Sequence, residues 1–127
     1  PQGRGPTHPA VAAELPDGCI AGKLHFSAVA GACHGLDQAG GPAQVVVCGM
    51  ETHVCVMQSV MELLESGRKV FVVEEAVGSR RDTDKALALA RMRDAGAAIV
   101  SREMVAFEWL RKADSGLFRD ISRNFLR

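Results

Sequence analysis

The sequence predicts an α/β fold, in which helices cover a parallel β-sheet. Two kinds of segment alternate along the chain: short apolar runs without polar alternation, and longer segments whose apolar residues recur at helical spacing. Uninterrupted apolar runs are typical of strands buried on both faces, and intervening helices imply right-handed parallel crossovers. We expect a three-layer, Rossmann-like sheet with about four strands, at residues 19–23, 45–47, 69–73 and 97–100.

The N-terminal region predicts an ordered loop before the first strand. Four of the first 16 residues are proline, which excludes a long helix or a central strand. Only residues 7–15 allow a short helical turn, with Thr7 as its cap. We then expect a strand at residues 19–23 that brings Lys23 to the carboxyl edge of the sheet, and a helix over residues 28–38 that its two glycines weaken.

The stretch from Val45 to Val56 places a thiol at a helix start. An apolar strand stops at Gly49, and helical spacing begins after Thr52. If Thr52 is the N-cap, Cys55 lies in the first turn, where unsatisfied N–H groups and the positive dipole end favour a thiolate. Ligand crevices open at this edge of parallel sheets. The alternative is a buried cysteine that acts as a small hydrophobic residue.

The second half of the chain continues the alternation. A buried strand at residues 69–73 completes a βαβ unit, and either Ser79 or Asp82 caps the next helix. Ser101 caps a further amphipathic helix, and residues 114–126 form a terminal helical segment. The inward stripe of the helix after residue 82 consists of Ala88, Leu89, Met92 and Ala95.

The two C-terminal helices carry more apolar residues than a small sheet can cover. Contiguous exposed apolar surface usually marks an interface, so we expect some of these residues to pack between subunits of a homo-oligomer. The residues are Met104, Phe107, Trp109, Leu110, Leu117, Phe118, Ile121, Phe125 and Leu126.

Composition narrows the class of partner. The 127 residues suit one domain, and 15 basic against 15 acidic residues give no net charge, so neither nucleic acid nor a membrane surface is indicated. A small-molecule substrate is the expected partner. The four cysteines lack CxxC spacing, which favours free thiols in a reducing cytoplasmic setting. No apolar run reaches the roughly 18 residues of a membrane span, and no leader is visible.

Residues 49–56 read Gly-Met-Glu-Thr-His-Val-Cys-Val, which resembles the nucleophile motif of the isochorismatase-like cysteine hydrolases, a superfamily that includes nicotinamidases. The likeness continues at residues 23–27, 76–80 and 103–110, and is closest to the short, single-domain members, which include the isochorismatase-domain proteins of eukaryotes. It implies six strands in the order 3-2-1-4-5-6, of which the first two are missing here. We therefore expect residues 1–127 to form a single domain that lacks the N-terminal part with the first strand.

The resemblance implies a cysteine nucleophile, a lysine and an aspartate base at the end of the first strand. Cys55 matches the nucleophile, and Lys23 matches the lysine of a Lys-x-x-Phe/Tyr-Ser motif. A lysine outside such a motif is usually a solvated surface group. Neither Asp17 nor Asp37 matches the base, and loss of general acid–base catalysis costs about 10²–10⁴-fold. We expect the isolated chain to be weakly active or inactive.

The resemblance also implies a cis peptide bond between Met50 and Glu51, and an oxyanion hole formed by the N–H groups of Glu51 and Cys55. We expect no cofactor and no metal, because the family's metal ligands belong to the missing part and the four histidines show no zinc-like pairing. His53 is more easily explained as structural than as catalytic, and Trp109 by packing. The candidate pocket residues are Phe26, Thr52 and His53.

Three functions remain open. The first is a hydrolase of the isochorismatase family that cleaves a small amide or related C–N substrate through a thioester on Cys55, impaired here by the missing aspartate. The second is a catalytically degenerate module for oligomerisation or interaction. The third, a cysteine-dependent redox or dinucleotide-binding protein, is weakened by the absent GxGxxG motif. An upstream apolar strand that ends in Asp-x-Gln would favour the first over the second.

Overall fold

The computed structural model describes residues 5–114 and 116–126 of the chain, so parts of the predicted N-terminal loop and terminal helix lie outside the described residues. Within the described residues the sheet has three parallel strands in the order β1-β2-β3. The strands are β1 (Gln44–Met50), β2 (Lys69–Gly78) and β3 (Ala98–Val100). The predicted α/β class with a parallel sheet is confirmed.

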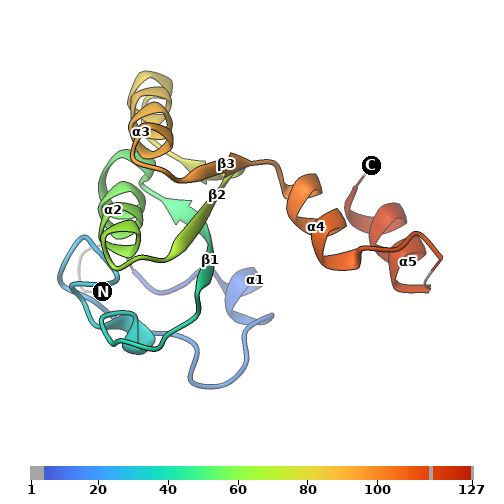
Figure 1. The fold of residues 1–127 in the computed structure, drawn as a ribbon. Helices are drawn as coiled ribbons and strands as arrows, with labels where there is room; N and C mark the ends of the chain where they lie inside the picture. Colours follow the sequence, from blue (N-terminus) through green and yellow to red (C-terminus); the bar gives the residue numbers. More distant parts are fainter. Residues whose placement is uncertain (1–4, 115, 127) are drawn as a thin grey trace.

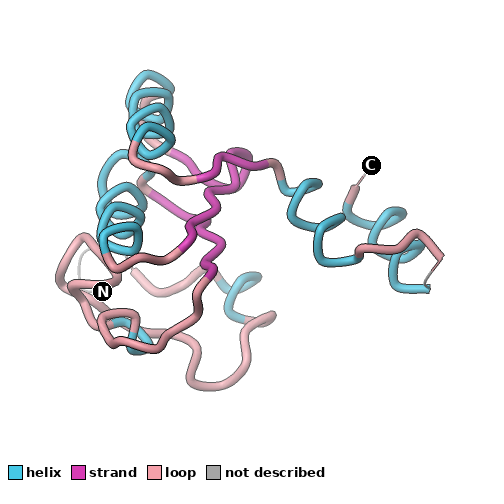
Figure 2. Tube along the Cα trace, in the orientation of Figure 1, coloured by secondary structure: helices cyan, strands magenta, loops and turns pink. Residues whose placement is uncertain are grey.

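Some helices lie beside one face of the sheet, and others extend beyond its last strand (Figure 1). Helices α2 and α3 pack against the sheet, whereas α4 and α5 project away beyond β3 (Figure 2). The helical elements are α1 (Pro9–Ala12), a 3₁₀ turn η1 (Cys33–Gly35), a π-helical turn η2 (Thr52–Val56), α2 (Met57–Glu65), α3 (Asp82–Asp94), α4 (Arg102–Leu110) and α5 (Gly116–Phe125).

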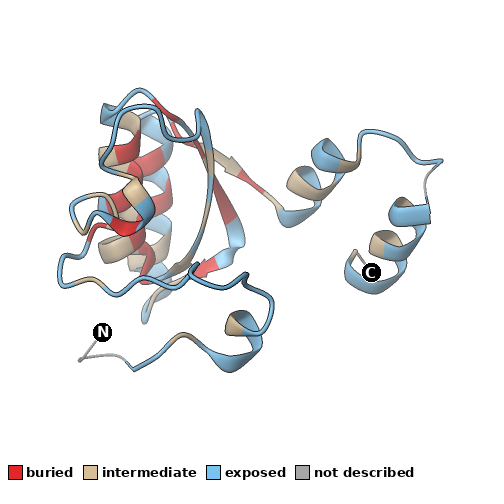
Figure 3. Cartoon of the chain, turned by 90° about the horizontal axis from the view of Figure 1, so that it is seen from below, coloured by how far each residue is buried: buried red, intermediate tan, exposed pale blue. Residues whose placement is uncertain are grey.

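The hydrophobic core lies between the sheet and the two helices α2 and α3 (Figure 3). The helical spacing of apolar residues in α2 buries Val60 and Leu63 completely or nearly so, and Met92 of α3 meets them together with Val70 and Val72 of β2. Full burial of one such side chain stabilises a fold by about 1.5–3 kcal/mol. This packing sets the position of the loops at the carboxyl edge of the sheet.

An irregularity in β2 supplies a side chain that binds the first residue of α4. Val47 pairs with Val72 and Gly49 with Val77, so two steps along β1 correspond to five along β2. The extra residues include Glu75, whose Oε2 accepts a 3.0 Å hydrogen bond from the backbone N–H of Arg102. A carboxylate at a helix N-terminus interacts favourably with the helix dipole.

Ser101 caps the same helix. Its Oγ accepts a 3.1 Å hydrogen bond from the backbone N–H of Met104, which confirms the predicted cap. Other predicted caps were wrong by one or two residues. His8 caps α1 instead of Thr7, Glu51 occupies the cap position before η2 instead of Thr52, and Arg81 occupies it before α3 instead of Ser79 or Asp82.

The predicted strand at residues 19–23 is wrong, because none of these described residues lies in a strand. A strand forms only beside another strand, because extended backbone without a hydrogen-bonding neighbour forms no ladder. The predicted helix over residues 28–38 is also wrong beyond the short turn η1. Ala32 and His34 adopt left-handed conformations with φ of 50° and 52°, which an α-helix excludes.

The expectation that β1 is covered on both faces is also wrong. Burial alternates along the strand between exposed and half-buried positions, and Val46 and Met50 are 38% and 70% exposed. Val45 and Val47 pack toward the core, whereas the alternate positions face away from it. Among the described residues β1 pairs only with β2, so it is an edge strand with one uncovered face.

None of the described helices is both long and apolar enough to cross a membrane.

Candidate active site

Cys55 lies in the turn η2, directly after the carboxyl end of β1. Gly49 adopts a φ of 128°, which favours glycine, and the chain then enters the turn. The carbonyl oxygen of Glu51 accepts hydrogen bonds from the backbone N–H groups of Val54 at 3.2 Å and Val56 at 3.1 Å. These two bonds fix the turn on either side of Cys55, whose side chain is half-buried.

Lys23 lies on the loop that faces this turn. Its Nζ donates hydrogen bonds to the carbonyl oxygens of His25 at 2.8 Å and Phe26 at 2.6 Å. An ammonium group has three N–H donors, so these two bonds orient it and leave a third donor. Lys23 and Cys55 line the same pocket, whose volume is about 300 Å³. The pocket is otherwise largely apolar and is bounded by Ala28, Leu36, Val45, Val46, Val47, Cys48, Gly49, Met50, Val56, Ser59 and Leu63.

Two polar side chains of α2 hold the lysine loop against the cysteine turn. Ser59 Oγ accepts a 2.9 Å hydrogen bond from the backbone N–H of Ala28 and donates a 2.7 Å bond to the carbonyl oxygen of Cys55. Glu62 Oε2 accepts from Ser27 Oγ at 2.6 Å and from the backbone N–H of Ala30 at 3.1 Å. The sequence reasoning missed Ser59 and Glu62, although both follow Cys55 at near-helical spacing on the same helix.

The peptide bond between Met50 and Glu51 is cis. Met50 lines the pocket, whereas the Glu51 side chain is buried at 3% exposure and its Oε1 lies 3.0 Å from Arg80 Nε. Arg80 follows β2 by two residues, in one of the segments that carries the family resemblance. Its position just past a strand end was the signal in the sequence that could have marked it as part of the site.

The other candidate pocket residues do not line this pocket. Phe26 is 60% exposed, and the ring of His53 contacts Ser79 instead, with 2.9 Å between Nδ1 and the hydroxyl oxygen. Thr52 is fully buried, and within the described residues its Oγ1 has no hydrogen-bond partner. The structure therefore brings Lys23, Met50 and Cys55 together and leaves Phe26, Thr52 and His53 around them.

The four cysteines are free thiols in different surroundings. Cys33 is buried, Cys19 is exposed, and Cys48 lies on β1 in the wall of the Cys55 pocket. Desolvation raises the pKa of the Cys48 thiol above its ordinary value, although part of the residue is exposed. Within residues 5–114 and 116–126 no cluster of three or more His, Cys, Asp or Glu side chains is arranged to hold a metal ion.

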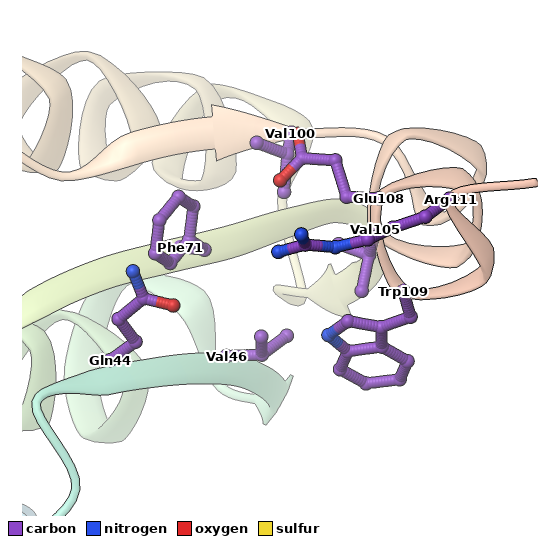
Figure 4. A pocket seen from close by; sticks show the side chains of 8 residues that line it. All are labelled: Gln44, Val46, Phe71, Val100, Val105, Glu108, Trp109 and Arg111. Carbon is purple, nitrogen blue, oxygen red and sulfur yellow. The ribbon is translucent and has the colours of Figure 1, made fainter.

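A second hollow of about 370 Å³ lies between the sheet and α4 (Figure 4). Its wall combines the Trp109 ring with Val46 and Phe71 of the sheet, and with the charged side chains Glu108 and Arg111. An apolar groove of about 510 Å³ continues from it toward α5. Only the Cys55 pocket combines a thiol in a helical first turn with a lysine, which selects it among the pockets of the described residues as the candidate site.

The chain is similar in sequence to a known family of proteins. The Isochorismatase domain model matches residues 3–104. The chain is 34% identical over 125 residues to isochorismatase domain-containing protein 2A of Mus musculus, covering 97% of this chain and 59% of the mouse protein. The chain thus spans about three fifths of the length of that relative.

Solved structures agree. MAR1 ribonuclease from Caenorhabditis elegans matches with a TM-score of 0.86 and 32% identity, covering all of this chain and 66% of the other. The YcaC gene product of Escherichia coli, described as an octameric hydrolase of unknown specificity, matches with a TM-score of 0.74 and 27% identity over 96% of this chain and 62% of its own. With its parallel sheet and its family match over residues 3–104, the chain belongs to the isochorismatase domain family.

Proposed function

We propose that this chain carries the nucleophile of a cysteine hydrolase, and that Cys55 attacks a small amide or related C–N substrate. The observation that carries the proposal is the shared pocket of Cys55 and Lys23, which come from segments far apart in the sequence. A positive ammonium favours a thiolate over a thiol, and the first helical turn adds the positive end of the helix dipole.

The proposed reaction has two steps. In the first, the Cys55 sulfur forms a bond to the carbonyl carbon, and the π electron pair moves to the oxygen, where the N–H groups of Glu51 and Cys55 are the proposed donors. The C–N bond then breaks, and the leaving nitrogen takes a proton and departs as an amine or ammonia. In the second step water attacks the thioester, which releases a carboxylic acid and restores the thiol.

The resemblance implies a carboxylate for proton transfer, and none is among the described residues that line the pocket. Asp17 and Asp37 are exposed, and neither lines the pocket. We propose that the base comes from outside these 127 residues and that the chain alone performs the first step slowly, since general acid–base catalysis contributes about 10²–10⁴-fold. No cofactor is needed for either step.

A homo-oligomer is the proposed state of assembly. The related YcaC protein of E. coli is octameric. Trp109 and Phe125 on α4 and α5 are 74% and 64% exposed, and both lie along the apolar groove between the sheet and the two helices. An exposed apolar surface of this kind usually marks an interface.

The rival function is a non-catalytic interaction module. The name of the C. elegans protein, a ribonuclease, adds a further possibility for the family, but the zero net charge of this chain does not favour a polyanionic substrate. A small amide fits the size and the largely apolar wall of the pocket better than a polyanionic substrate does.

Trapping of an acyl adduct tests the proposal. The chain is incubated with a panel of small primary amides and N-carbamoyl compounds, quenched in acid and analysed by intact mass and peptide mapping, with released ammonia as a second readout. We expect an acyl group on Cys55 that Cys55→Ser abolishes. Cys48→Ser is the matched control, because Cys48 lines the same pocket. Adducts that survive Cys55→Ser overturn the proposal, and no adduct or ammonia from any compound favours the interaction module.

A further inference from the structure

Five polar side chains cluster at the carboxyl ends of β1 and β2, behind the turn that carries Cys55. Three follow β2, at its end and in the first turn of α3, and two belong to the start of η2. Met50 pairs with Gly78 at the ends of the two strands, so the residues that follow each strand are neighbours in space. The cluster consists of Glu51, His53, Ser79, Arg80 and Asp84.

The centre of the cluster is the buried carboxylate of Glu51, which is 3% exposed. Arg80 Nε lies 3.0 Å from its Oε1 and 3.2 Å from its Oε2. A buried carboxylate is costly unless a cation and hydrogen bonds compensate its charge. The Arg80 side chain is itself 71% exposed, so solvent screens part of this ion pair.

His53 ties the turn to the same loop. Its Nδ1 lies 2.9 Å from Ser79 Oγ, while its Nε2 lies 3.6 Å from Glu51 Oε2 and 3.9 Å from Asp84 Oδ2. The ring therefore has polar partners on both nitrogens and bridges the turn η2 to the start of α3. Its exposed fraction is 23%, so solvent screens these contacts only in part.

These contacts converge on the backbone that presents Cys55. The carbonyl of Glu51 accepts from the backbone N–H groups of Val54 and Val56, which flank Cys55. A residue whose side chain and carbonyl are both held cannot rotate without breaking the first hydrogen bonds of the turn. Arg80 restrains the turn through the Glu51 carboxylate, and His53 restrains it through Ser79.

We propose that Arg80 and His53 are positioning residues for the nucleophile. Arg80 compensates the Glu51 charge, so that a second negative charge, the Cys55 thiolate, is tolerated in the same turn, and His53 fixes this turn against the β2–α3 loop. A like charge close to a titratable group disfavours its ionised form, and the Arg80 cation offsets that effect. Lys23 supplies the other cation, from across the pocket. This inference rests on the proposed function in that Cys55 is the reactive group.

A merely structural ion pair is the alternative, and it makes a different prediction. If Arg80 only holds loops together, its removal loosens the fold and exposes several cysteines together. If Arg80 positions the nucleophile, its removal lowers the reactivity of Cys55 while the other thiols stay unchanged. Alkylation measured separately at each cysteine distinguishes the two.

The test measures the rate of iodoacetamide labelling at Cys55, Cys48 and Cys19 by peptide mass spectrometry from pH 6 to pH 10. The variants are Arg80→Gln, Arg80→Lys, His53→Asn and, as the matched control, Arg81→Gln. Arg81 is the exposed neighbour of Arg80 and lines the same surface hollow, of about 350 Å³, with Asp84. Circular dichroism and thermal unfolding show whether each variant is folded.

We expect Arg80→Gln to slow Cys55 labelling at neutral pH by about threefold or more and to move its pH profile toward higher pH. Arg80→Lys should restore most of the rate because it keeps the charge, His53→Asn should slow Cys55 labelling alone, and Arg81→Gln should change nothing. Equal Cys55 profiles in wild type and Arg80→Gln overturn the inference, as does a parallel change at all three thiols. If Arg80→Gln does not fold, His53→Asn and Arg80→Lys decide by the same criteria. Because labelling needs no substrate, the inference can stand even if no amide is hydrolysed, and can fail while acyl adducts still form.

Discussion

Ser59 Oγ donates a 2.7 Å hydrogen bond to the carbonyl oxygen of Cys55 one helical turn earlier, and Ser59 Oγ itself accepts a 2.9 Å hydrogen bond from the backbone N–H of Ala28. One hydroxyl thus joins the helix that presents the candidate nucleophile to the loop that presents Lys23. The pocket between them depends on this hydroxyl and on Glu62, which binds the same loop one turn further along α2.

Replacement of Ser59 by alanine should loosen the lysine loop. Loss of two largely buried hydrogen bonds lowers the free energy of unfolding by about 1–3 kcal/mol, since Ala28 N–H loses its partner. We expect Cys55 labelling to slow as well, because Lys23 is held less firmly. Thermal unfolding and alkylation kinetics measure the two effects. Ser122→Ala on α5 is the control, because no side-chain hydrogen bond of Ser122 is found within the described residues. Equal effects of both substitutions would count against the linking role of Ser59.

Cys48 should label slowly at neutral pH. Desolvation raises the pKa of its thiol, so a smaller fraction is thiolate at pH 7 than for a fully solvated thiol, although Cys48 is exposed at the surface. The labelling rate of Cys19, which is also exposed, is the comparison. The thiolate fraction rises as pH approaches and passes the raised pKa, so the two rates should converge in strongly alkaline solution. Labelling in urea provides the reference, since both thiols are then solvated. A Cys48 rate at pH 7 that matches Cys19 in the folded chain would show that its surroundings do not desolvate it.

Arg68 should be important for stability although its own side chain does not line the pocket. It is 9% exposed, its Nη1 donates to the carbonyl oxygen of Leu36 at 2.7 Å, and its Nη2 donates to that of Gln38 at 2.9 Å. Arg68→Met leaves both acceptors without this donor and should lower the free energy of unfolding by about 2 kcal/mol or more. Urea titration checks the value, with the exposed Arg91→Met on α3 as control.

Gly41 offers an independent test of the same anchor. A Cβ atom at this position would lie 2.6 Å from Arg68 Nη2, so Gly41→Ala should displace the guanidinium. We expect a loss of stability in the same direction as for Arg68→Met, and little further loss when the two changes are combined. Full additivity in a double-mutant cycle would show that Gly41 and Arg68 act separately.

The exposed apolar residues of α4 and α5 should drive self-association. We expect a discrete oligomer on a sizing column with light scattering, and dissociation by Trp109→Glu or Phe125→Glu because each buries a charge in the interface. Leu24→Glu is the matched control, since Leu24 is 93% exposed and lies on the N-terminal loop. A stable monomer whose Trp109 is protected from quenchers would refute the interface, and polydisperse species would indicate non-specific aggregation.

The sequence predicted best those elements whose signal is local. The apolar runs of β1, β2 and β3 and the Ser101 cap depend on residues within a few positions of one another, and each is present in the structure. Of the predicted inward stripe, Ala88, Leu89 and Met92 are buried on α3, whereas the prediction for Ala95 is wrong because it is exposed just past the end of the helix. The strand at residues 19–23 failed because a strand needs a partner, which is information that lies outside the segment itself. The cover expected over β1 failed for the same reason.

The residues of the candidate site also divide into those with a local signal in the sequence and those without one. Cys55 and Lys23 were identified by motifs, and both line the pocket. Ser59, Glu62 and Arg80 were missed because their importance arises from contacts across 29 to 35 positions of sequence. A serine in a helix and an arginine just past a strand end are common features, so the signal that each carries in the sequence is weak, and the contacts of the folded chain show their importance.

The buried core cluster has a kinetic consequence. Its buried members all fall between Val56 and Ala97, so within the described residues this cluster comes from one contiguous piece of chain. Such a piece opens only when the whole domain unfolds, whereas peripheral segments open locally at a lower free energy. Amide hydrogens from Val56 to Ala97 should therefore exchange most slowly with solvent deuterium. Cys55 is the residue immediately before this slowly exchanging piece. The candidate nucleophile therefore lies at the boundary between the stable core and segments that open locally.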